Sequence, residues 1–80
     1  MITGKVTGKL WVSRKVNQLP AGALVIVSPN DEKKSQIVAL DPLGCGEGEQ
    51  VLIVTGSIAA DYFSQPDVLV DAIVVASIDH

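Results

Sequence analysis

Residues 2–12 read Ile-Thr-Gly-Lys-Val-Thr-Gly-Lys-Leu-Trp-Val, and this stretch alternates between two kinds of side chain. The even positions carry Ile, Gly, Val, Gly, Leu and Val, whereas the odd positions carry Thr, Lys, Thr, Lys and Trp. A period of two is typical of a β-strand with one buried face. Gly4 and Gly8 fall on that face, where a missing side chain lets a strand bend or another backbone approach. The stretch therefore predicts a curled strand of a small barrel.

Four further segments of the chain have the composition of short strands. Residues 24–28 and 35–40 are separated by the polar stretch 29–34, which is typical of a turn, so we expect them to pair as a hairpin. Residues 49–55 follow a glycine-rich turn, and residues 72–78 are the last strand-like run. The chain is thus expected to form five strands.

One short helix is expected between the last two strands. Gly56 ends the fourth strand, and Ser57 can cap a helix by accepting a hydrogen bond from a free backbone N–H. Residues 58–63 favour a turn or two of helix before Pro66. Five strands and one short helix predict an all-β fold, a five-stranded OB-like barrel.

The size and composition of the chain favour self-association. Eighty residues predict a single domain over 1–80, and a domain this short buries only about 60% of its surface. Hydrophobic residues nevertheless make up 48% of the chain and charged residues only 19%. Cys45 is the only cysteine, so no disulfide is available, and no His/Cys cluster indicates a metal or other cofactor.

Two strand segments point to where copies of the chain meet. Residues 51–54 and 72–76 are apolar at every position, so we expect both faces of each strand to be buried away from water. A small barrel has one interior, and another copy of the chain is the simplest cover for the outer face. The alternative is that the chain's own helix and loops cover it. The candidate subunit-interface residues are Gly56, Ser57, Val74 and Val75.

Charge and patterning indicate a soluble, cytoplasmic protein without a membrane or nucleic-acid partner. The formal net charge is −3, which argues against a phosphate-binding surface. Residues 1–11 alternate in polarity and include Lys5 and Lys9, unlike a signal or transit peptide. All apolar runs are far shorter than the roughly 20 residues that cross a bilayer.

Three ordered segments carry a resemblance to a known family: 38–52 (VALDPLGCGEGEQVL), 56–60 (GSIAA) and 70–79 (VDAIVVASID). In this order they resemble the ethanolamine-utilisation and carboxysome vertex-protein family. The beginning is similar too, through residues 2–8 and then Ser13, Lys15, Leu19, Gly22 and Leu24. The chain departs from the family's pattern at Cys45, where Ala is usual, and at Ile58 and Ala60, which replace Ser and Arg.

The resemblance implies a structural role in a bacterial microcompartment. Members of that family are small OB-like barrels that assemble, usually as pentamers, into truncated pyramids. These plug the vertices of polyhedral shells built from hexameric and trimeric tiles, so the implied partners are further copies of the chain and those tile proteins. Such a protein is not an enzyme and needs no cofactor.

The glycine-rich turn is the candidate pore-lining segment of such a ring. Gly44, Cys45 and Gly46 are small enough for five backbones to approach a symmetry axis, where Cys45 would form a ring of thiols. The alternative is that the turn packs against a neighbouring subunit away from the axis, with Cys45 buried as a small hydrophobe. Asp41 is expected to fix this turn rather than to act as a base.

No catalytic or metal site is expected. Cys45 is a lone cysteine, and His80 is the last residue of the sequence and has no second His beside it. The rival function is an OB-fold module for single-stranded nucleic acid, but one Trp, one Tyr and one Phe do not make an aromatic platform. Trp11 lies on the polar face of the first strand, where it either caps the barrel or sits at a subunit contact.

Overall fold

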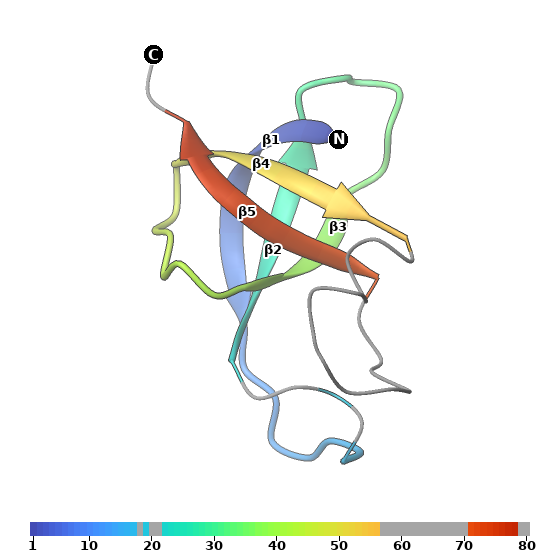
Figure 1. Ribbon diagram of the computed structural model, residues 1–80, viewed down its shortest axis with the longest axis vertical. Coiled ribbons are helices and arrows are strands. Elements are labelled where there is room, and N and C mark those ends of the chain that lie inside the picture. The colour runs from blue at the N-terminus through green and yellow to red at the C-terminus, as the bar shows by residue number, and fades with distance from the viewer. Residues whose placement is uncertain (18, 20–21, 57–70, 79–80) are drawn as a thin grey trace.

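The computed structural model describes residues 1–17, 19, 22–56 and 71–78, and these form a closed barrel of five strands (Figure 1). The order around the barrel is β1-β2-β3-β5-β4, with every neighbouring pair antiparallel except β3 and β5, which are parallel. The strands are β1 (Ile2–Leu10), β2 (Ala23–Pro29), β3 (Ile37–Asp41), β4 (Gln50–Thr55) and β5 (Ala72–Ile78). The predicted all-β, five-stranded barrel is confirmed.

The strand bounds follow the sequence pattern closely. The predicted strand 72–78 coincides with β5, and the expected hairpin is the antiparallel pair of β2 and β3. The first strand ends at Leu10, two residues earlier than the alternation suggested. The expected helix over residues 58–63 lies outside the described residues.

Strand β1 contains an irregularity that decides which side chains reach the core. Val6 pairs with Val27, but Gly8 pairs with Ile26, so Thr7 is an extra residue in the ladder. A bulge of one residue reverses the alternation beyond it. Leu10 is therefore 40% exposed, and the prediction of one buried face from residue 2 to residue 12 is wrong beyond the bulge.

At Gly4, β1 and β2 leave no room for a side chain. A Cβ atom built there would lie 2.6 Å from Cγ1 of Val27 and 2.7 Å from the carbonyl oxygen of Ser28. Both distances are too short for a side-chain carbon, so only glycine fits between these strands. The expected close backbone approach on the inward face of β1 is confirmed at Gly4.

The barrel interior is filled by small and branched aliphatic side chains from all five strands and from the glycine-rich turn. The aliphatic side chains of Leu40 and Ile73 are also buried but lie outside this cluster, and these two residues pair across β3 and β5. The interior cluster consists of Val6, Val25, Val27, Ala39, Cys45, Val51, Ile53, Ala72 and Val74.

Candidate assembly surfaces

The outer face of the barrel is apolar across four neighbouring strands. On β4, Val51 and Ile53 are buried inside the barrel, whereas Leu52 and Val54 are half-buried on the opposite face. The pairing register carries this outward face across the neighbouring strands. We call it the outer wall: Leu24, Ile26, Val38, Leu40, Leu52, Val54, Ile73 and Val75.

A bulge on β5 separates the two valines singled out from the sequence. Ile53 pairs with Val74 and Leu52 pairs with Ala76, so Val75 is the extra residue of this ladder. Val74 is fully buried in the core, whereas Val75 is 40% exposed. Of the two candidate interface valines, Val75 is the one that a neighbouring chain can touch directly.

Gly56 lies beside the start of β5. Its φ of 76° is in the left-handed region, and its N–H donates to the carbonyl oxygen of Asp71 at 2.7 Å. The structure thus brings Gly56 to the pair of strands that carries Val75, because Thr55 pairs with Ala72. Ser57, the fourth candidate interface residue, lies outside the described residues.

The glycine-rich turn is organised by one buried carboxylate. Oδ1 of Asp41 accepts hydrogen bonds from the N–H groups of Leu43, at 2.9 Å, and Gly44, at 3.2 Å. Oδ2 accepts from the N–H of Cys45 at 2.6 Å. The expected structural role of Asp41 in this turn is confirmed. Gly44 has a positive φ of 78°, as a tight turn requires.

Cys45 is a core residue of its own chain. Its side chain is 3% exposed and belongs to the interior cluster of the barrel. Burial, together with the nearby carboxylates of Asp41 and Glu49, raises the pKa of the thiol to about 11. The thiol is therefore protonated at neutral pH and is a poor nucleophile. Gly44 is exposed and Gly46 is half-buried; the place of this turn relative to a symmetry axis stays a prediction.

A second apolar surface lies at the end of β1, where the sequence pattern predicts a buried face instead. We call it the end patch: Leu10, Trp11, Val12 and Val16, all exposed. Trp11 is 91% exposed, so the alternative in which it caps the barrel is wrong, whereas the subunit contact stays a prediction. The alternation of residues 2–12 predicts Leu10 and Val12 in the core, but the bulge before Gly8 turns Leu10 outward and Val12 lies beyond the end of β1.

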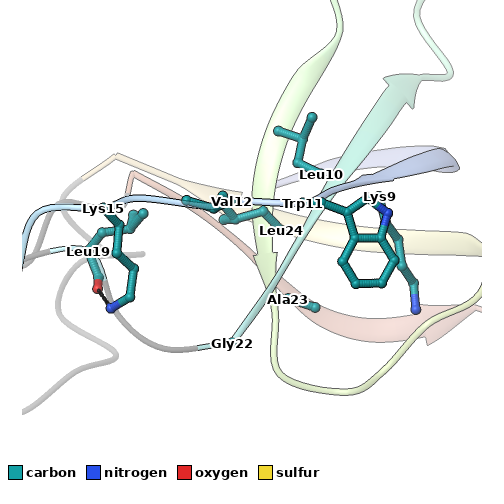
Figure 2. Close-up of a pocket in the computed structure, with 9 residues that line it drawn as sticks. All are labelled: Lys9, Leu10, Trp11, Val12, Lys15, Leu19, Gly22, Ala23 and Leu24. Atoms are coloured by element: carbon teal, nitrogen blue, oxygen red, sulfur yellow. Dashed lines mark hydrogen bonds between the residues drawn. The ribbon is translucent and has the colours of Figure 1, made fainter.

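Leu10, Trp11 and Val12 of the end patch form part of the lining of a pocket of about 300 Å³. Figure 2 shows Val12 and Leu24 in its middle, with Trp11 on one side and Lys15 and Leu19 on the other. The ammonium of Lys15 donates to the carbonyl oxygen of Leu19 at 3.1 Å, which closes that side (Figure 2). The pocket is lined by Lys9, Leu10, Trp11, Val12, Lys15, Leu19, Gly22, Ala23 and Leu24.

Residues 1–17, 19, 22–56 and 71–78 contain no group of three His, Cys, Asp or Glu residues that could hold a metal ion. In the same part of the chain, no helix has the length and apolar character needed to cross a membrane.

Comparison with known proteins gives a consistent assignment. The family model described as ethanolamine utilisation protein EutN/carboxysome matches residues 1–79. The pentameric shell protein MSM0273 from the RMM microcompartment is 39% identical over 99% of this chain and 91% of its own, with a TM-score of 0.89. The pentameric microcompartment shell protein GrpN from Rhodospirillum rubrum is 32% identical over 100% of this chain and 96% of its own, with a TM-score of 0.82.

A third solved structure extends the similarity to ethanolamine utilisation. EutN from Escherichia coli is 31% identical over 99% of this chain and 85% of its own, with a TM-score of 0.81. The search of curated proteins found no match. Because the family model and these structures cover nearly the whole chain, this protein belongs to the EutN/carboxysome family of microcompartment shell proteins.

Proposed function

We propose that this chain is a structural shell protein that forms homopentamers and caps the vertices of a polyhedral bacterial microcompartment in the cytoplasm. One observation carries the proposal: the barrel superimposes along nearly its full length on shell proteins that are themselves described as pentameric. This similarity favours the shell role over a nucleic-acid-binding OB-fold module.

The distribution of apolar side chains supports a ring. In a single chain the outer wall keeps Val75 exposed and Leu52 and Val54 only half-buried, whereas its members Leu40 and Ile73 are already covered by the chain itself. Burial of apolar surface contributes roughly 25 cal/mol per Å², so a few hundred Å² per contact rivals the stability of a domain this small. Cyclic symmetry closes such contacts without leaving an apolar surface unpaired.

The proposed subunit interface includes the four residues named from the sequence. Val75 and Gly56 lie at exposed positions of the β4 and β5 pair, and Ser57 follows Gly56 directly in the chain. Val74 supports the interface from the core side, where its side chain holds β5 against β4.

The glycine-rich turn is the proposed lining of the axial opening. Gly44 is exposed, and a Cβ atom built there meets nothing within 4 Å, so the turn presents little more than backbone on that side. Three hydrogen bonds to Asp41 hold its shape. In this arrangement Cys45 contributes its backbone to the opening while its thiol stays in the core.

The proposed partners are hexameric and trimeric shell tiles, with no nucleic acid and no cofactor. The role requires no chemistry, so the chain is not expected to be an enzyme, in keeping with the protonated, buried thiol of Cys45. Shells co-produced without this chain should form but leak at the vertices, and adding it back should seal them. Shells that retain cargo equally well without it would argue against the vertex role.

Native mass spectrometry tests the assembly directly. The purified chain should have the mass of five 8.4 kDa subunits. A stable monomer at micromolar concentration would contradict the proposal. Binding of single-stranded DNA in an electrophoretic mobility assay would instead support the rival OB-fold function.

A further inference from the structure

The end patch gathers exposed apolar side chains more densely than any other described segment of the surface. Leu10, Trp11, Val12 and Val16 lie within seven residues, and the indole of Trp11 is almost fully exposed in the single chain. Exposed apolar clusters of this kind usually mark interaction sites. Tryptophan is also enriched among residues that dominate binding energy at interfaces.

The pocket that Leu10, Trp11 and Val12 help to line makes this surface concave. Its volume of about 300 Å³ is at the lower end of the range seen for ligand sites, and its middle is lined by Val12 and Leu24. The cationic side chains of Lys9 and Lys15 lie at its margin. A complementary surface would therefore present aliphatic side chains flanked by carboxylates.

The charges of the chain are separated along its sequence. Residues 1–30 contain four Lys and Arg residues and no Asp or Glu. Residues 35–80 contain seven Asp and Glu residues and no Lys or Arg. The end patch belongs to the cationic part, whereas β4 and β5 belong to the anionic part.

Strand β5 carries the complementary combination of groups. Val75 is exposed at its bulge, next to the half-buried Leu52 and Val54 of β4. Asp71 is exposed directly before the strand, and Oε2 of Glu49 accepts a hydrogen bond from Ser77 near its other end, at 3.1 Å. The β5 side therefore presents aliphatic side chains with a carboxylate near each end. This arrangement complements the apolar end patch and the lysines at its margin.

A cyclic ring needs two different surfaces that fit each other, because each subunit contacts its two neighbours through opposite sides. We propose that the end patch of one subunit receives the β5 side of the outer wall of the next subunit. The apolar side chains supply the burial, while the separated charges orient the two copies and disfavour contacts between like surfaces. This inference rests on the proposed pentamer and names the two surfaces that meet at each of its subunit contacts.

Trp11 reports on this contact directly because it is the only tryptophan of the chain. In the assembled ring its emission should shift to shorter wavelength, and quenching by acrylamide should fall several-fold relative to a dissociated chain. The Val75→Asp variant serves as the dissociated reference, with its fold checked by circular dichroism.

Charge reversal gives an independent measurement. Lys9 directly precedes the end patch in the chain, and the exposed Arg14 lies between its members Val12 and Val16. The double variant Lys9→Glu/Arg14→Glu therefore places carboxylates beside the patch and should leave only a small fraction of the chain as pentamer in native mass spectra. The matched control is Lys33→Glu/Lys34→Glu, which reverses the same number of charges on the loop between β2 and β3 and should leave the pentamer intact. Circular dichroism shows whether each variant keeps its strands.

Each result separates this inference from the function on which it rests. If the wild-type chain is a monomer, the proposed pentamer is wrong, and the inference that rests on it is wrong as well. A pentamer in which Trp11 stays fully quenchable, or in which Lys9→Glu/Arg14→Glu assembles normally, would overturn the inference and leave the vertex role standing. Protection of Trp11 only after a hexameric tile or a single-stranded oligonucleotide is added would also overturn it, because the patch would then serve that partner.

Discussion

The carboxylate of Asp41 accepts a hydrogen bond from the backbone N–H of Cys45 at 2.6 Å, and both residues are buried. The same side chain also holds the N–H groups of Leu43 and Gly44. One side chain at the end of β3 thus determines the course of the turn that leads toward β4. The proposed axial opening depends on this turn.

Replacing Asp41 by Asn should destabilise the protein by about 1–3 kcal/mol, because the amide offers one acceptor oxygen and turns a donor toward N–H groups. Urea unfolding at fixed chain concentration measures the decrease in the free energy of unfolding. Asp31→Asn is the matched control: its Oδ1 accepts one bond from the N–H of Lys33 at an exposed loop and should cost at most about 0.5 kcal/mol. Equal effects of the two variants would contradict the structural role of Asp41.

The close approach at Gly4 gives a prediction about β1. A Gly4→Ala variant should lose about 1–3 kcal/mol or fail to fold, since its methyl group would lie 2.6 Å from Cγ1 of Val27. Gly8→Ala should be tolerated, because the atom closest to a Cβ there is Cδ1 of Ile26 at 4.0 Å. Thermal unfolding of the two variants compares them, and a stable Gly4→Ala protein would show that β1 and β2 lie further apart.

The buried thiol predicts a loss of stability at alkaline pH. Its pKa is raised to about 11 in the folded chain, above the ordinary value of 9.0, so the unfolded chain releases this proton first as pH rises. The contribution of the thiol is therefore fully present below pH 9 and declines between pH 9 and 11, by roughly 2 kcal/mol. Cys45→Ala should remove this part of the pH dependence. If the variant loses as much stability between pH 9 and 11 as the wild type, other groups cause the loss.

The same burial predicts slow modification of Cys45. A thiol reagent should react with the native protein far more slowly than with protein unfolded in urea, because the side chain is 3% exposed and protonated. Absorbance at the reagent's product wavelength follows the reaction. Rapid modification in the intact ring would place the thiol in the axial opening, as the ring-of-thiols hypothesis requires.

The two valines of β5 should respond differently to the same substitution. Val75→Asp should yield a folded chain that no longer forms rings, because assembly would bury an unpaired carboxylate at a cost of several kcal/mol. Val74→Asp places that charge in the barrel core and should prevent folding. Native mass spectrometry with circular dichroism distinguishes the outcomes, and Ser35→Asp, at an exposed loop position, serves as the control. A pentameric Val75→Asp protein would move the subunit boundary elsewhere.

Much of the fold was predictable because the relevant chemistry is local. The alternation of residues 2–6, the polar turn between β2 and β3, and the aliphatic run of β5 each contain their own signal. The same holds for Asp41, a short acidic side chain that precedes a glycine-rich stretch and bonds to N–H groups two to four residues further on. The family resemblance then indicated how the barrels assemble.

By itself, the sequence determined that residues 51–54 and 72–76 are apolar on both faces of their strands and that the charges are separated between two parts of the chain. Only the tertiary structure decided which side chains stay outside. A bulge at Thr7 turns Leu10 outward, and a bulge at Val75 leaves Val74 in the core. Each bulge is a mismatch of register with a partner strand distant in the sequence, so its position follows from how the barrel closes and not from neighbouring residues.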